Sequence, residues 1–94
     1  MNTTRAIRIA ITDDHPMVVK GLRQILEGYD QFEVIASYTS GKALLDGLQR
    51  VVPDVLLLDM QLPDITGEEL TRNILSRYPA LKILILTSHD NVFF

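Results

Sequence analysis

The sequence predicts a single α/β domain built on a doubly wound parallel sheet. Short apolar runs rich in β-forming residues alternate along the chain with segments whose apolar residues recur at helical spacing. One run, Val55–Leu58, has only apolar residues, which is typical of a strand buried on both faces. The 94 residues suffice for one domain and are too few for two. Because crossovers between parallel strands are almost always right-handed, the helices should cover both faces of the sheet.

The first strand is predicted at Ile7–Thr12, a mostly apolar, β-rich run followed by two aspartates. A helix should follow over Pro16–Glu27, because Pro16 fits a first turn, where its missing N–H is not needed, and Gly28 suits the end of the helix. A second strand is expected at Glu33–Tyr38. The apolar stripe of the helix comprises Val18, Leu22, Ile25 and Leu26.

The alternation of strand and helix then repeats. Ser40 can cap a second helix, which Pro53 and Asp54 should break before the third strand. That strand is Val55–Leu58, and Asp59 closes it. The apolar face of the second helix comprises Leu44, Leu45, Leu48 and Val52.

The last third of the chain predicts one more helix and strand. Thr66 and Glu69 have the spacing of a capping box, and Pro79 should end the helix that they begin. A fourth buried strand is expected at Ile83–Leu86, and Val92–Phe94 can start another helix. The apolar stripe of the third helix comprises Leu70, Ile74, Leu75 and Tyr78.

The composition excludes several classes of protein. Hydrophobic residues make up 47% and charged residues 22%, which is ordinary for a globular domain and argues against disorder. The net charge of −3 comes from scattered residues without a basic stripe, so this segment alone is not expected to bind DNA. Without cysteine, the chain has neither disulfides nor thiolate metal sites. No signal peptide or membrane-spanning run is visible, so we expect a soluble protein with no membrane partner, and a cytoplasmic location is allowed.

Polar residues gather where the predicted strands end. In open parallel sheets, ligands bind outside the carboxyl ends of the strands. This rule places Asp13 and Asp14 after the first strand, Asp59 after the third and Thr87 after the fourth, all at one edge. Converging carboxylates repel one another unless a cation compensates them, and their oxygens are the ligands that Mg2+ prefers. A magnesium site that also handles phosphate is therefore expected, and an aspartate there can act as a nucleophile.

Each of these residues also has a purely structural interpretation. An isolated aspartate after a strand, such as Asp13 or Asp14, often caps a helix or forms a turn. Thr87 can be a simple β-branched strand residue. His15 fits the N-cap region before Pro16, and His89 lies in a polar turn, so neither histidine is assigned to a metal or to catalysis.

Three strings in the sequence together resemble the receiver domains of bacterial response regulators. They are Ile11–Pro16 (ITDDHP), Asp59–Asp64 (DMQLPD) with Gly67, and Leu86–Ser88 (LTS). The resemblance covers the whole length, so residues 1–94 are expected to form one receiver domain with the flavodoxin-like strand order 2-1-3-4. The Asp-Asp-His-Pro opening looks most like the NarL-like branch, whose receivers usually precede a helix-turn-helix DNA-binding domain that is absent here.

The resemblance also implies a role for each site residue. Asp59 looks like the phospho-acceptor, Asp14 like a direct Mg2+ ligand and Asp13 like a ligand through water. Together with Asp59, the main-chain carbonyl of Gln61 would complete the protein ligands of the metal, and Thr87 looks like the switch hydroxyl. In the family a sensor histidine kinase donates the phosphoryl group, so the chain would be a phospho-accepting signalling domain in transcriptional control rather than an enzyme.

One departure from the family concerns the C-terminal part. Receivers normally carry a lysine after a fifth strand, and this sequence ends before that strand and the final helix, so we expect a receiver that is incomplete at its C-terminus. Lys20, Lys42 and Lys82 belong to helices or to the far edge of the sheet and do not replace it. The edge of Ile83–Leu86 would then be unpaired, and we expect the fragment to self-associate there.

Two other hypotheses stay open at this stage. A Mg2+-dependent phosphohydrolase with an aspartyl nucleophile would use a similar sheet, but such enzymes resemble one another in an Asp-x-Asp pair after the first strand, whereas Asp13 and Asp14 are adjacent. Steady turnover of a phosphate ester would favour it. The third hypothesis, motivated by the missing lysine, is an inert or regulatory fragment used only for protein contact. Failure to accept phosphate even when the fifth strand is restored would favour it.

Overall fold

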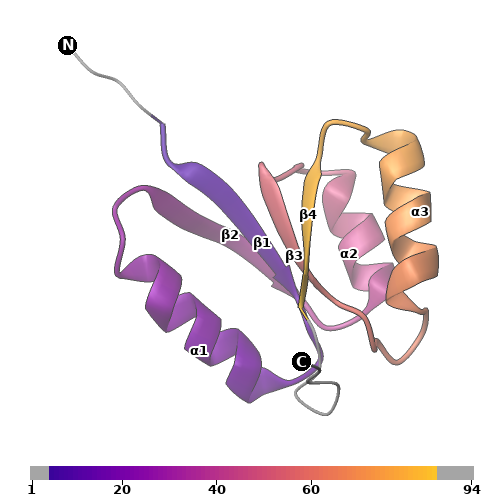
Figure 1. Cartoon of the computed structure of the whole chain (residues 1–94), viewed down its shortest axis with the longest axis horizontal. Coiled ribbons are helices and arrows are strands. Elements are labelled where there is room, and N and C mark those ends of the chain that lie inside the picture. The colour runs from indigo at the N-terminus through magenta and orange to yellow at the C-terminus, as the bar shows by residue number, and fades with distance from the viewer. Residues whose placement is uncertain (1–4, 87–94) are drawn as a thin grey trace, which may run out of the picture.

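The computed structural model describes residues 5–86 and shows a parallel sheet between two layers of helix (Figure 1). The elements alternate along the chain, and the strand order is β2-β1-β3-β4. The predicted doubly wound fold is therefore confirmed. The elements are β1 (Ile7–Thr12), α1 (Pro16–Glu27), β2 (Phe32–Tyr38), α2 (Gly41–Leu48), β3 (Val55–Asp59), α3 (Gly67–Arg77) and β4 (Lys82–Leu86).

The core consists of two clusters, one on each face of the sheet. On one face Leu56 and Leu58 of β3 are fully buried with Leu44 of α2 and Leu70 of α3. On the other face Ile9, Ile11 and Leu57 pack against α1 through Val19, Leu22 and Leu26. The alternate residues of β3 thus serve both clusters, as the unbroken apolar run predicts.

Local sequence signals set the ends of the helices. Ser40 accepts a hydrogen bond from the N–H of Ala43, and Thr66 accepts one from the N–H of Glu69, so both predicted caps are present. Pro16 occupies the first turn of α1.

The predicted apolar stripes were partly wrong. Helix α2 ends at Leu48, so Val52 lies outside it, although Val52 still packs against the core. The physical reason is that a residue before proline, here Pro53, is driven to extended backbone angles. In α1, Val18 is 42% and Ile25 is 62% exposed, because α1 packs on the sheet through a narrower stripe than its periodicity suggests.

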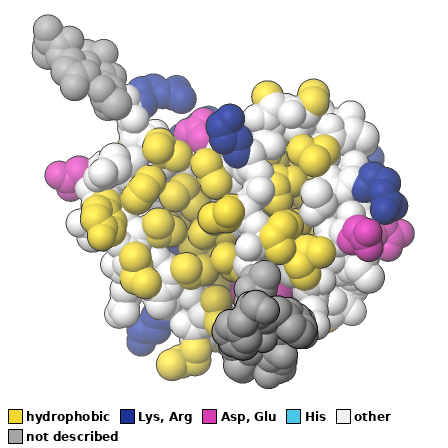
Figure 2. Space-filling view, in the orientation of Figure 1, with side chains coloured by type: hydrophobic (Ala, Val, Ile, Leu, Met, Phe, Trp, Pro, Cys, Tyr) yellow, Lys and Arg dark blue, Asp and Glu magenta, His cyan; other side chains and the backbone are white. Residues whose placement is uncertain are grey.

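Strand β4 is the edge of the sheet among the residues described. It pairs with β3 alone, and its Leu84 is 59% exposed. In the space-filling view of Figure 2, hydrophobic side chains gather over the middle of the face that is turned to the viewer. Within residues 5–86, no helix is both long and apolar enough to cross a bilayer.

Candidate functional site at the carboxyl ends of the strands

The two central strands place two carboxylates side by side. Thr12 of β1 pairs with Leu58 of β3, so Asp13 and Asp59 both stand where the paired segment ends. The backbone N–H of Asp13 donates to the carbonyl of Tyr38, 3.0 Å away, which fixes the end of β1 against β2. Both aspartate side chains are nearly inaccessible, 5% exposed at Asp13 and 7% at Asp59. The strand-end rule therefore predicted their convergence correctly.

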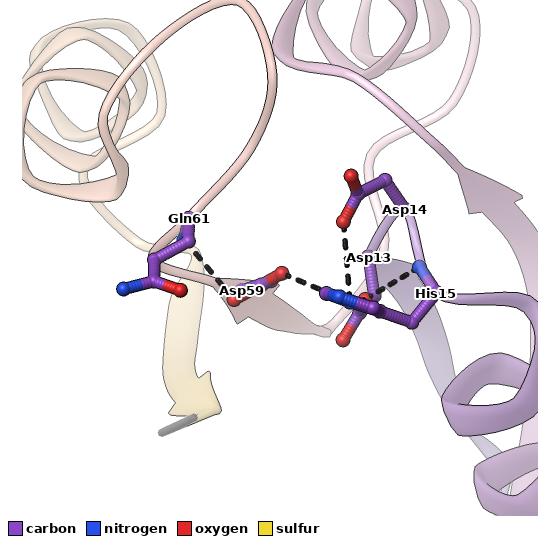
Figure 3. Close-up of polar contacts among 5 residues, drawn as sticks. All are labelled: Asp13, Asp14, His15, Asp59 and Gln61. Atoms are coloured by element: carbon purple, nitrogen blue, oxygen red, sulfur yellow. Dashed lines mark hydrogen bonds and ion pairs between the residues drawn. The ribbon is translucent and has the colours of Figure 1, made fainter. Parts of the chain in front are cut away.

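Asp14 and His15 complete the cluster on its solvent side. One ligand atom from each of Asp13, Asp14, His15 and Asp59 lies within 4.8 Å of the others (Figure 3). The side chain of Asp14 is 35% exposed and that of His15 is 63% exposed. The cluster is thus buried at the sheet and open at the loop that leads into α1.

His15 belongs to this cluster although its sequence context predicted only a place near the N-cap of α1. His15 is the N-cap residue of α1, as predicted, but its side chain makes no capping hydrogen bond. Its Nδ1 instead lies 2.7 Å from Oδ1 of Asp13 and 3.2 Å from Oδ1 of Asp14. The hydrogen bond to Asp13, helped by the negative charges, raises the pKa of His15 above its ordinary value. Its position directly after two strand-end aspartates was the available signal.

Asp59 carries the least compensated charge of the cluster. Its Oδ1 accepts a hydrogen bond from the N–H of Gln61 at 3.1 Å. Its Oδ2 is buried and has no hydrogen-bond partner among the described residues, and the nearest cationic atom is Nδ1 of His15 at 3.8 Å. Burial is the main cause that raises the pKa of Asp59, and the neighbouring Asp13 and Asp14 add to it.

The loop between β3 and α3 brings the main chain of Gln61 to the cluster. Gln61 forms an isolated bridge with Thr66, and the carbonyl of Met60 accepts a hydrogen bond from the N–H of Gly67 at 2.9 Å. The loop therefore closes on itself beside Asp59 (Figure 3). Gly67 is required there, because a Cβ at this position would lie 2.5 Å from Cα of Met60.

The arrangement has the chemistry of a divalent cation site. Three carboxylates share a small volume, and a buried oxygen of Asp59 has no hydrogen-bond partner in the part of the chain that the structure describes. Oxygen ligands from carboxylates are what Mg2+ takes in proteins, so the residues present fit that ion. Thr87, the predicted switch hydroxyl, lies outside the described residues, as do His89 and Val92–Phe94, but the preceding Leu86 pairs with Asp59.

A family model and several related sequences place this chain among the same kind of proteins. A family model described as the response regulator receiver domain matches residues 9–94. The transcriptional regulatory protein DegU of Brevibacillus brevis is 38% identical over 85 residues, which is 90% of this chain and 36% of that protein. The DNA-binding transcriptional activator DevR/DosR of Mycobacterium tuberculosis is 37% identical over 90% of this chain and 39% of its own length. The chain thus spans well under half of these relatives.

Solved structures agree with the sequence comparison. The non-phosphorylated receiver domain of the stress response regulator RcsB from Escherichia coli superposes with a TM-score of 0.85 at 31% identity, covering 93% of this chain and 69% of that one. The receiver domain of the NarL regulator from Mycobacterium tuberculosis gives a TM-score of 0.83 at 26% identity, covering 93% and 70%. The relatives are regulators of the NarL and LuxR type, as the Asp-Asp-His-Pro opening suggested. The chain belongs to the response regulator receiver domain family, whose members are signalling domains rather than classical enzymes.

Proposed function

We propose that this chain accepts a phosphoryl group on Asp59 from the phosphohistidine of a sensor histidine kinase. The observation that carries the proposal is the buried Oδ2 of Asp59, which has no hydrogen-bond partner within residues 5–86 and lies in a cluster of carboxylates. A buried, uncompensated charge is costly for stability, so its presence at a strand end favours a functional role.

The proposed transfer is a displacement at phosphorus. A carboxylate oxygen of Asp59 attacks the phosphorus, the P–N bond to the kinase histidine breaks, and its electron pair stays on the imidazole nitrogen, which takes a proton from water. Asp13, Asp14, Asp59 and the main-chain carbonyl of Gln61 would hold Mg2+. When bound, the ion neutralises charge on carboxylate and phosphoryl oxygens during the transfer.

The output of the signal is proposed to be transcriptional. Thr87 would supply the hydroxyl that hydrogen-bonds the new phosphoryl group, so that local charge changes the nearby surface. RcsB has been solved in complex with DNA, and DevR/DosR is a DNA-binding activator. Since this chain has a net charge of −3 without a basic stripe, we assign DNA contact to a domain outside it. We assign the protein to the cytoplasm because its relatives are transcriptional regulators.

The test is phosphorylation of the complete gene product by an acyl phosphate with Mg2+. Intact mass should show one phosphoryl group that hydroxylamine removes, and Asp59→Asn should show none. Asp46→Asn is the matched control, because Asp46 pairs with Lys42 at 3.2 Å on an exposed part of α2 and should leave labelling unchanged. Equal hydroxylamine-sensitive labelling of the Asp59→Asn variant would refute the assignment.

A further inference from the structure

The loop that carries Gln61 is fastened to a helix outside the acidic cluster. Both carboxylate oxygens of Asp64 accept hydrogen bonds from the first amides of α2: Oδ1 from the N–H of Gly41 at 2.9 Å and Oδ2 from the N–H of Lys42 at 2.9 Å. These amides belong to the group that has no partner within a helix. Asp64 therefore joins two segments that are 22 and 23 residues apart in the sequence.

The joint is also closely packed. A Cβ on Gly41 would lie 2.3 Å from Cγ2 of Ile65, so the absence of a side chain at Gly41 lets the loop rest directly on the start of α2. The two amide hydrogen bonds hold the pKa of Asp64 below its ordinary value, so its carboxylate is charged at neutral pH. A negative charge at a helix N-terminus is favourable as well.

This joint matters because the other hydrogen bonds of the loop lie at its ends. The bond from Gln61 to Asp59 and the bond from Gly67 to Met60 fix where the loop leaves β3 and enters α3. The contacts of Asp64 and Ile65 with α2 hold its far side. Leu62 of the same loop is buried in the core, so Asp64 and Ile65 add the contacts that fix where the loop lies against the start of α2.

We propose that Asp64 is a positioning residue, which keeps the main chain of Gln61 in place beside Asp59 by hydrogen-bonding the loop to the start of α2. The inference rests on the proposed function, because it concerns the Mg2+ site. Mg2+ demands near-octahedral geometry at about 2.0–2.1 Å, so a small displacement of a carbonyl ligand weakens binding. Loss of an outer-shell partner typically costs about 10- to 100-fold in metal affinity, and an exposed residue such as Asp64 should lie near the lower end.

The control for stability lies at the opposite end of the sheet. Asp54 accepts a hydrogen bond from the N–H of Arg8 at 2.8 Å, across 46 residues of sequence. Asp54→Asn therefore alters the same kind of carboxylate-to-amide contact, far from the cluster. It should lower the thermal midpoint without changing metal affinity.

The experiment measures Mg2+ affinity by calorimetry and the thermal midpoint without metal, for the wild-type chain and its variants. Asp64→Ala should weaken Mg2+ binding by about 10-fold. Asp64→Asn should weaken it less, because the amide oxygen still accepts one hydrogen bond, and it serves as the test variant should the alanine variant not fold. Unchanged Mg2+ affinity in the Asp64 variants, or an equal loss in Asp54→Asn, would overturn the positioning role while leaving the proposed function intact. A wild-type chain that does not bind Mg2+ would overturn both.

Discussion

Asp59→Asn should make the chain more stable without metal and less stable with it. The Asp59 side chain is 7% exposed, and its Oδ2 is buried without a hydrogen-bond partner in the described part of the chain. Asparagine has nearly the same shape and can still accept the hydrogen bond from Gln61, but it removes a charge from beside Asp13 and Asp14. The substitution therefore relieves repulsion and desolvation in the metal-free chain.

The size of the effect follows from the burial. An unsatisfied buried polar group costs about 1–3 kcal/mol, and since the asparagine amide leaves part of that cost in place, we expect a gain of about 1 kcal/mol. For a domain of this size, about 1 kcal/mol raises the thermal midpoint by about 4–8 °C. Mg2+ bound as proposed, at about 100 times its Kd, would stabilise the wild type by about 2.7 kcal/mol, and the variant would lack one of the proposed ligands. The wild type should then become the more stable protein by about 1.7 kcal/mol if the variant no longer binds the ion.

The destabilising effect of Asp59 on the metal-free chain should decrease as the pH falls. The pKa of Asp59 is raised in the folded chain, chiefly by burial, so the folded state takes up a proton before the unfolded state does. The destabilisation is present at neutral pH, decreases as the pH falls through the folded pKa, and is gone below the ordinary value of 3.8. The advantage of Asp59→Asn in the absence of metal should shrink over the same interval.

The assay is thermal unfolding followed by circular dichroism, with a chelator or with MgCl2, at ionic strength matched with KCl. Asp46→Asn controls for the loss of a surface carboxylate and should respond to Mg2+ like the wild type, because Asp46 is 56% exposed and away from the cluster. A metal-free Asp59→Asn variant with a lower thermal midpoint than the metal-free wild type would refute the predicted gain in stability. An equal Mg2+ response in the two proteins would refute the predicted loss of stabilisation by the metal.

Three further predictions concern other parts of the molecule. In the metal-free chain, His15 contributes stability that is complete below pH 6.5 and is lost as the pH rises through its raised pKa. The thermal midpoints of His15→Gln and the wild type should therefore converge at alkaline pH. A difference in thermal midpoint that stays the same at every pH would contradict this. Gly67→Ala should lower the free energy of unfolding in urea by about 1–3 kcal/mol, because the new Cβ would lie 2.5 Å from Cα of Met60. Gly21→Ala should raise it by up to about 1 kcal/mol, because the new Cβ would have no described atom within 4 Å. Sedimentation of the wild-type chain should show concentration-dependent association through the edge of β4, and Leu84→Lys should reduce this association. A wild-type chain that is monomeric at every concentration would exclude association through this edge.

The features that the sequence predicted well depend on neighbours in the chain. The bounds of β1 and α1 follow from an apolar run, two aspartates and Pro16, all within one short segment. Val52 was misplaced because its helix ends early and the chain returns to the sheet, where the carbonyl of Val52 accepts a hydrogen bond from Arg8. Ile25 is exposed because burial on α1 depends on how the whole helix lies across the sheet.

The site residues also differ in whether the local sequence could predict their positions. Asp13 and Asp59 could be placed from the strand ends, because parallel neighbouring strands end at one edge. His15 could not, since its role depends on which way an N-cap side chain turns, and it turns toward the carboxylates rather than back to the helix. Asp64 could not either, because its partners lie 22 and 23 residues away and are brought together only by the packing of a loop on α2.

The position of His15 bears on why this cluster suits a divalent cation. A single imidazole nitrogen lies 2.7 Å from Asp13, 3.2 Å from Asp14 and 3.8 Å from Asp59. Even when protonated, it sets one positive charge against three carboxylates, and its shortest contacts are not with the buried oxygen of Asp59. An ion with two charges and several coordination positions can approach all three carboxylates at once. The imidazole therefore compensates Asp13 and Asp14 more than Asp59, and the remaining charge lies on Asp59, where the proposed chemistry takes place.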